Sequence, residues 1–278
     1  MKKVMGVSLL LILTALCVML LGLRSQEESA AGIQRPVLLL TQRDTGAYFM
    51  QLRQGILKAL EEQNCTLSTQ IVDPAAMTDV LWGGIKYSGV LIYIQDETLR
   101  RQTLRSAREH GMPIALIDAH EEGVPSVEQD GAQYAALASG AAAKAERVIC
   151  LGGSEPLRKA AKSVLRSRWL DAQSVDPGAA SCAVMALDEE TAARLLQEKA
   201  EGTQPLILVN PGEGAASWLE TGHVHAVVLP SPYATGYIAA SQALWNKNGQ
   251  GYRAPAFVVT PENMYDAQNV KLVFPLLY

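Results

Sequence analysis

The sequence predicts an α/β protein with two lobes, each built on a parallel β-sheet, behind one N-terminal transmembrane helix. Short apolar runs typical of buried strands alternate with segments that have the apolar periodicity of helices. The alternation falls into two successive series along the chain. A length of 278 residues, 49% of them hydrophobic, is sufficient for two lobes of ordinary domain size.

The N-terminal segment predicts a membrane anchor. Lys2 and Lys3 precede residues 4–23, which carry no charge and would cross about 30 Å of hydrocarbon as a helix. The lysines favour an N-terminus on the cytoplasmic side, so the bulk of the chain is expected outside the cytoplasm. Two alternatives are a signal peptide cleaved near Ala31 and a lipid-modified Cys17.

The first α/β series begins after a polar tether. Its expected strands are residues 37–41, 68–72, 88–94 and 113–117, and its expected helices are residues 50–63, 75–87 and 98–110. Gly111 marks the end of the last helix, because glycine readily adopts the left-handed conformation found there. Short continuous apolar strands suit a parallel sheet that is covered on both faces.

The second series repeats this architecture without repeating the sequence. Its expected strands are residues 147–151, 182–187, 206–209, 225–229 and 256–259, and its expected helices are residues 133–145, 156–170, 189–201, 215–219 and 235–246. Regular alternation implies right-handed βαβ units and parallel pairing. Cys150 and Cys182 lie in apolar runs and are interpreted as small core residues. With Cys65 they make an odd number, which is not a disulfide framework.

Composition and motifs disfavour several functional classes. A net charge of −4 without a basic patch makes nucleic acid an unsuitable partner. The glycines at 212–214 only weakly resemble a phosphate-binding loop, and His223 and His225 lack further metal ligands nearby. No G-x-S-x-G nucleophile context is present. The prediction is therefore a protein without catalytic residues, cofactor or metal.

Several markers occur in a recognisable order along the chain. They are Tyr48-Phe49 after the first strand, Gly55 in the first helix, Asp118 at the end of "MPIALID", "VPSVEQDGAQYAALA", Arg158 in "ICLGGSEPLRKAAK", Asn210 at the end of "LILVN", "PSPYATGYIAASQAL" and "FVVTPEN". Over about residues 37–263 the chain resembles the periplasmic sugar-binding proteins of the ribose-binding type. These share the periplasmic binding protein-like I fold with LacI-type repressor cores.

The resemblance implies two Rossmann-like lobes that close on a small polar ligand through three hinge crossings. The implied boundaries are residues 1–32 for anchor and tether, 33–129 and 231–258 for lobe 1, and 130–230 and 259–278 for lobe 2, with crossings near 118–130, 229–233 and 258–262. The implied ligand contacts are Tyr48, Phe49, Asp118, Arg158 and Asn210. Asp44 and Arg43, on the first loop, could also face the cleft.

Each of these residues also has a structural interpretation. The aromatic pair could cap the first helix, Asp118 and Asn210 could serve turns, and Arg158 could be a solvated charge. The chain also departs from the family. Ala119 stands where an Arg often follows the aspartate, Gly46 where an Asn often precedes the aromatics, and Pro230 where a Gln is common. The segment between Asn210 and His223 is short, which suggests that the second lobe lacks one βα unit.

The leading hypothesis is a membrane-anchored extracytoplasmic protein that binds a carbohydrate or similar solute and presents it to an ABC-type transporter or membrane sensor. The alternative is a degenerate binding fold that recognises a protein, as the ectodomain partner of a sensor kinase. A transcription-regulator core is disfavoured, because the apolar anchor occupies the place of a helix-turn-helix before Val37.

Overall fold

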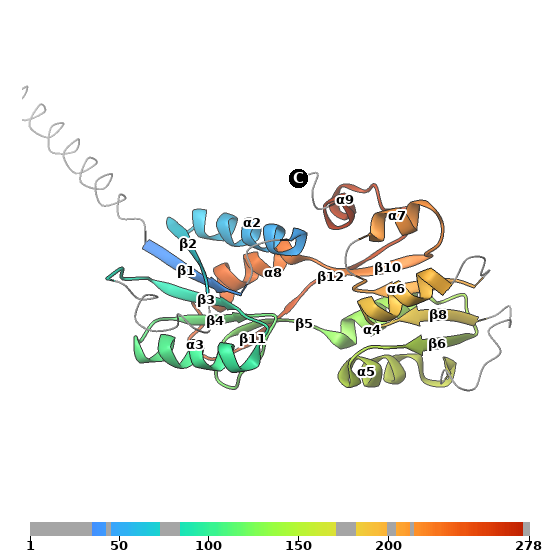
Figure 1. Ribbon diagram of the computed structural model, residues 1–278, viewed down its shortest axis with the longest axis horizontal. Coiled ribbons are helices and arrows are strands. Elements are labelled where there is room, and N and C mark those ends of the chain that lie inside the picture. Colours follow the sequence, from blue (N-terminus) through green and yellow to red (C-terminus); the bar gives the residue numbers. More distant parts are fainter. Residues whose placement is uncertain are drawn as a thin grey trace, which may run out of the picture.

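The computed structural model describes residues 35–42, 46–72, 84–170, 182–198, 204–211 and 214–274. These residues form two α/β lobes that lie side by side (Figure 1). No helix among them is long and apolar enough to span a membrane, and the predicted anchor at residues 4–23 lies outside them.

The first lobe is a six-stranded sheet with helices on both faces. Its strands are β1 Arg35–Thr41, β2 Cys65–Ile71, β3 Gly89–Tyr93, β4 Ile114–Ile117, β5 Ser126–Gln129 and β11 Gly251–Ala254. Its helices are α2 Ala47–Glu61, α3 Glu97–Glu109 and α8 Pro232–Ile238, which continues into a π-helical turn, η4 Ala239–Ala243. The strand order is β11-β5-β4-β3-β1-β2, and all its pairs are parallel.

The second lobe has the same layered design. Its strands are β6 Arg147–Leu151, β7 Trp169–Leu170, β8 Cys182–Ala186, β9 Leu206–Val209, β10 Ala226–Pro230 and β12 Ala256–Val259. Its helices are α4 Gly131–Ala141, α5 Glu155–Leu165, α6 Glu189–Glu198, α7 Ala215–Glu220 and α9 Ala267–Val273, with a 3-10 turn, η2 Arg166–Arg168. The order is β12-β10-β9-β8-β6-β7, in which only β10 and β12 pair antiparallel among the described strands.

Alternation along the strands produces the two core layers of each lobe. In β1, Val37 and Leu39 pack with α2 and η4 on one face, whereas Leu38 and Leu40 pack with α3 on the other. All four are fully buried. A strand that buries successive residues on opposite faces must be covered on both sides, which explains its continuous apolar run.

Helices α2 and α8 pack unusually closely through two glycines. A Cβ on Gly55 would lie 2.0 Å from the carbonyl oxygen of Tyr233, and a Cβ on Gly236 would lie 2.1 Å from that of Leu52. The two helices therefore approach to a distance that any side chain at these positions would prevent. This contact holds α8 on the first lobe after the chain returns from the second.

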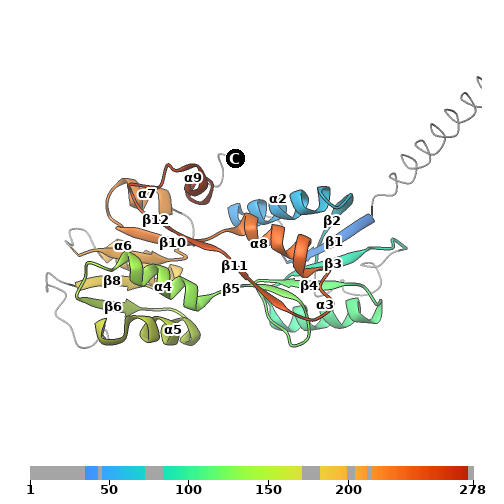
Figure 2. The same cartoon turned by 180° about the vertical axis from the view of Figure 1, so that it is seen from behind.

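The chain crosses between the lobes three times (Figure 2). It passes from β5 to α4, returns from β10 to α8, and passes again from β11 to β12. The third crossing was predicted at 258–262, and this is wrong: it lies at Pro255, because residues 256–259 already pair with β10 in the second sheet. Gln51 in α2 also donates a hydrogen bond of 2.5 Å to the Lys271 carbonyl in α9, joining the lobes directly.

Several local expectations also need correction. Residues 84–88 are not helical, so the helix predicted at 75–87 does not reach its expected end, and residues 73–83 lie outside the described part. The helix predicted at 156–170 ends at Leu165, because Arg166 has φ of 51° and residues 169–170 pair with β6. Among the described residues both sheets have six strands, so the second lobe is not one strand short of the first.

The short elements β5, β7, β11 and α9 were missed, because they lack long apolar runs. Cys150 and Cys182 are buried and unpaired in the second sheet, as predicted, and Cys65 is half-buried and unpaired.

Candidate functional site

A cavity of about 520 Å³ lies where the carboxyl ends of the first-lobe strands face the second lobe. Its lining residues are Tyr48, Tyr93, Gln95, Asp118, Ala119, His120, Glu128, Gln129 and Asn210. All but Asn210 belong to the first lobe or its crossing strand β5. Open parallel α/β sheets bind ligands outside the carboxyl ends of their strands, and the volume is in the range of about 300–1,000 Å³ typical of small-molecule sites.

A short hydrogen-bonded chain lies in the cavity wall. The Tyr48 hydroxyl, in the first turn of α2, donates to Asp118 Oδ2 at 2.5 Å, and the Gln129 amide donates to the same hydroxyl at 3.3 Å. This chain joins the first helix, the tip of β4 and the first crossing strand, so that three separate segments meet at one carboxylate.

Asp118 and Asn210 occupy equivalent positions in the two lobes. Asp118 follows β4 with φ of 52°, and its N–H donates to the Val127 carbonyl at 2.8 Å; Asn210 follows β9 with φ of 46°, and its N–H donates to the Val228 carbonyl at 2.8 Å. Asp and Asn tolerate this left-handed conformation better than most residues. The predicted placement of both residues just past strand ends of opposite lobes is confirmed.

Asp118 is an unusual carboxylate. Burial raises its pKa to about 6, although the hydrogen bonds from Tyr48 and Gln129 act in the opposite direction. Its Oδ1 atom is buried and has no hydrogen-bond partner among the described residues. A carboxylate with an unsatisfied oxygen is costly to keep ionised in a protein interior, so this group favours any ligand that supplies a donor.

Aromatic rings form one wall of the cavity. The rings of Tyr48 and Tyr93 are nearly parallel, at an interplanar angle of 15° and a centroid distance of 6.1 Å. Burial, with the Asp118 charge as a second cause, raises the pKa of Tyr93 to about 12 and that of Tyr48 well above its usual value. Both phenols are therefore uncharged at neutral pH and present apolar faces with polar tips.

Two predicted site residues do not line the cavity. Phe49 is only 4% exposed, packs in the first-lobe core and stacks against Tyr93 with ring centroids 6.3 Å apart. Adjacent helical residues point about 100° apart, and here this rotation places Tyr48 at the cavity and Phe49 in the core. Arg158 is exposed in the first turn of α5. Because Arg158 belongs to the second lobe, its distance from the cavity depends on how far apart the lobes lie, and a local sequence pattern cannot predict this. Asp44 and Arg43 lie outside the described residues.

Six lining residues were missed from the sequence, namely Tyr93, Gln95, Ala119, His120, Glu128 and Gln129. Tyr93 and Gln95 follow the apolar run of β3, so polar residues at a predicted strand end were an available signal. Gln129 and Glu128 lie in β5, which was interpreted as part of the first crossing and not as a strand.

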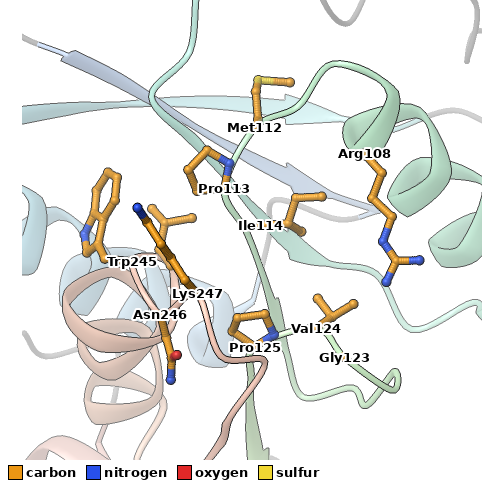
Figure 3. A pocket seen from close by; sticks show the side chains of 11 residues that line it. Arg108, Met112, Pro113, Ile114, Gly123, Val124, Pro125, Trp245, Asn246 and Lys247 are labelled. Atoms are coloured by element: carbon orange, nitrogen blue, oxygen red, sulfur yellow. The ribbon is translucent and has the colours of Figure 1, made fainter.

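A second cavity, of about 260 Å³, lies at the other end of the first-lobe strands, opposite the first cavity (Figure 3). It is enclosed by the segments that precede β4, β5 and β11, including Met112, Pro125 and Trp245. Because it lies at the amino-terminal ends of parallel strands, it is a weaker candidate than the first cavity. Among the described residues no group of three or more His, Cys, Asp and Glu side chains could hold a metal ion. The His223 ring instead contacts a hydroxyl, with its Nδ1 atom 2.6 Å from Thr221 Oγ1.

Comparison with solved structures shows the same fold in sugar-binding proteins. The periplasmic ribose ABC transporter of Conexibacter woesei matches with a TM-score of 0.68 and 17% identity over 87% of this chain and 98% of its own. An ABC transporter solute-binding protein from Agrobacterium vitis, bound with α-D-tagatopyranose, has a TM-score of 0.64 and 16% identity over 86% and 99%. A mutant XylFII–LytSN complex has a TM-score of 0.67 and 16% identity over 84% and 99%.

No family model matches the sequence, and the search of curated proteins found no match. The structural similarities establish the fold: the chain has the periplasmic binding protein-like I fold, as the resemblance in sequence indicated.

Proposed function

We propose that the chain is an extracytoplasmic solute-binding protein that captures a carbohydrate or a similar polar small molecule between its lobes. The observation that carries this proposal is the cavity in which Tyr48 and Asp118 of the first lobe and Asn210 of the second line one space. Tyrosine faces suit the apolar side of a sugar ring, and carboxylate and amide groups suit its hydroxyls.

Ligand capture would act through the arrangement of the lobes. A ligand that contacts Asp118 and Asn210 together interacts best when the two lobes are close, so its binding free energy favours the closed state. The three crossings at β5, β10 and β11 are the segments about which such a movement would occur. Closure is the signal that we propose a membrane transporter or sensor detects.

The binding prediction concerns Asp118. Replacing Asp118 by Ala should weaken the binding of a sugar by at least about tenfold, because a hydrogen bond to a charged group contributes about 1.5–3 kcal/mol and about 1.4 kcal/mol is one decade of affinity. Calorimetric titration of the full-length chain with a panel of pentoses and hexoses measures this. Glu97→Ala, an exposed substitution on α3, is the control and should leave the affinity unchanged.

If no sugar of the panel binds, or if Asp118→Ala binds as tightly as the unmodified protein, the carbohydrate proposal is wrong. In that case the alternative gains support, in which the fold recognises a protein as the ectodomain partner of a sensor kinase. One observation favours this alternative: the similar structures include XylFII in a complex with LytSN.

A second prediction concerns the membrane. We expect the full-length chain to sediment with membranes and its lobes to be degraded by protease added outside the cytoplasmic membrane, because residues 4–23 are uncharged and follow two lysines. A variant lacking residues 1–31 is the control, and it should not sediment with the membranes. If the chain expressed with residues 1–31 is cleaved near Ala31 and recovered in soluble form, the prediction of an anchor is wrong.

A further inference from the structure

The cavity contains two carboxylates with different surroundings. Glu128 Oε1 accepts a hydrogen bond from Ser126 Oγ at 2.6 Å and lies 2.9 Å from His120 Nδ1. Its other oxygen, Oε2, lies 3.7 Å from Arg253 Nη1. The charge of Glu128 is thus already matched by a cation and two polar neighbours.

Asp118 has no such compensation. The groups that hydrogen-bond to it, the Tyr48 hydroxyl and the Gln129 amide, are both neutral. Its Oδ1 atom has no partner, and no cationic side chain of the described residues forms an ion pair with it. A buried carboxylate without a counter-ion is destabilised relative to one that is paired. A ligand that brings a positive charge into the cavity removes this penalty, whereas a neutral hydroxyl only supplies a donor.

The rest of the lining also suits a cation. The Tyr48 and Tyr93 rings carry no charge at neutral pH, and an ammonium group near an aromatic face is attracted by the ring quadrupole. Side-chain amides supply acceptor oxygens for the remaining N–H groups of an ammonium. These amides belong to Gln95, Gln129 and Asn210.

We propose that the cavity selects amino sugars, that is polyhydroxylated rings bearing a protonated primary amine, and that Asp118 is the counter-ion of the amine. This inference rests on the proposed function and specifies its ligand class. Acidic sugars are expected to bind worst, because Asp118 and Glu128 line the same space and repel a ligand carboxylate.

Matched ligand pairs test this inference. The full-length chain is titrated at pH 7.5 with D-glucosamine and D-glucose, D-galactosamine and D-galactose, and D-mannosamine and D-mannose, together with D-glucuronate. Within the pair that fits the cavity, the amino sugar should bind at least about tenfold more tightly than the neutral sugar, because its hydrogen bond to the carboxylate is charged on both sides. Raising the salt concentration should reduce this ratio.

The variant Asp118→Asn separates charge from shape. The asparagine keeps the size of the side chain and its ability to accept a hydrogen bond, so the neutral sugar should still bind, whereas the ratio of amino to neutral affinity should fall to about one. Glu97→Gln, on the surface of α3, is the matched control and should preserve the ratio. Circular dichroism confirms that each variant is folded.

Three results would overturn the inference. If neutral sugars bind as tightly as their amino counterparts, the carbohydrate function stands and the amine selectivity is wrong. If the selectivity persists in Asp118→Asn, the amine has a different counter-ion. If no ligand of the panel binds, both the selectivity and the proposed function fail.

Discussion

Replacing Gly55 by Ala should lower the free energy of unfolding by at least about 2 kcal/mol. The added Cβ would lie 2.0 Å from the Tyr233 carbonyl oxygen, and backbone atoms cannot move aside as a flexible side chain can. Helices α2 and α8 would have to separate and lose core contacts on both sides. Overpacking of this kind usually costs about 1–3 kcal/mol and can cost more, and the better helix propensity of Ala recovers only part of it.

Urea unfolding followed by circular dichroism measures this effect, and Gly140→Ala is its control. Gly140 lies within helix α4, and a Cβ there would meet no atom within 4 Å, so this substitution should stabilise the protein by about 0.5–1 kcal/mol through helix propensity. Gly236→Ala should act like Gly55→Ala. The double variant should lose less than the sum, because the first substitution already separates the helices. Equal stabilities of Gly55→Ala and Gly140→Ala would contradict the close contact.

Replacing Asp118 by Asn should stabilise the protein at neutral pH, by about 3 kcal/mol at pH 7. The folded state raises the pKa of Asp118 to about 6, whereas an unperturbed Asp titrates near 3.9. Below pH 3.9 the carboxyl is neutral in both states and burial of its charge costs nothing. Between the two pKa values the unfolded chain loses its proton first, so stability falls as the pH rises. Above about pH 6 the full cost of about two pKa units is present.

The measured quantity is the difference in unfolding free energy between Asp118→Asn and the unmodified protein from pH 3 to pH 8, in which other titrations largely cancel. Titratable groups that contact or line the site include Tyr48, Tyr93, His120 and Glu128, and the two tyrosines stay neutral over this range because burial raises the pKa of each. A difference that does not grow between pH 4 and pH 6 would contradict the raised pKa.

Asp188 in the second lobe supplies a control of opposite sign. Burial raises its pKa, but hydrogen bonds from the backbone N–H groups of Gly153 and Thr191 outweigh this, and the net pKa is lowered. Such a carboxylate contributes stability above its unfolded pKa that is lost as the pH falls through its folded pKa. Asp188→Asn should therefore destabilise the protein at pH 7, and the difference should vanish at low pH.

The expected effects of Asp118→Ala on binding and of Asp118→Asn on stability together indicate a trade-off between stability and binding. The same uncompensated carboxylate that weakens the fold at neutral pH is the group from which we expect most of the ligand affinity. Preorganised sites commonly hold such strained or unsatisfied groups, because a ligand can gain only what the free protein leaves unsatisfied.

Local sequence patterns were sufficient for most of the strands that have continuous apolar runs. The predicted bounds of residues 147–151, 206–209 and 256–259 agree with β6, β9 and β12. A short continuous apolar run is typical of a strand covered on both faces, so the pattern has a direct structural reason. The same argument located Asp118 and Asn210, since a polar residue that follows such a run lies just past the carboxyl end of the strand.

Strands without apolar runs, and the position of the third lobe crossing, could not be obtained this way. Strands β5 (SVEQ) and β11 (GYRA) pair with each other at the side of the first sheet, and their residues have no apolar periodicity. Whether residues 256–259 belong to one lobe or the other depends on their antiparallel pairing with β10, which is a long-range contact. A short segment adopts a strand when a partner offers hydrogen bonds, and the partner is not visible in its own residues.

The sequence by itself determined the α/β class, the order of most elements, and the strand-end positions of Asp118 and Asn210, because apolar periodicity and strand ends are local properties. Only the tertiary structure decided that Tyr48 faces the cavity while Phe49 is buried, that Gln129 and Tyr93 join the site, and that Arg158 stays outside it. These outcomes depend on helix rotation, on the close contact at Gly55 and on the spacing of two lobes, each of which is set by contacts between residues far apart in the chain.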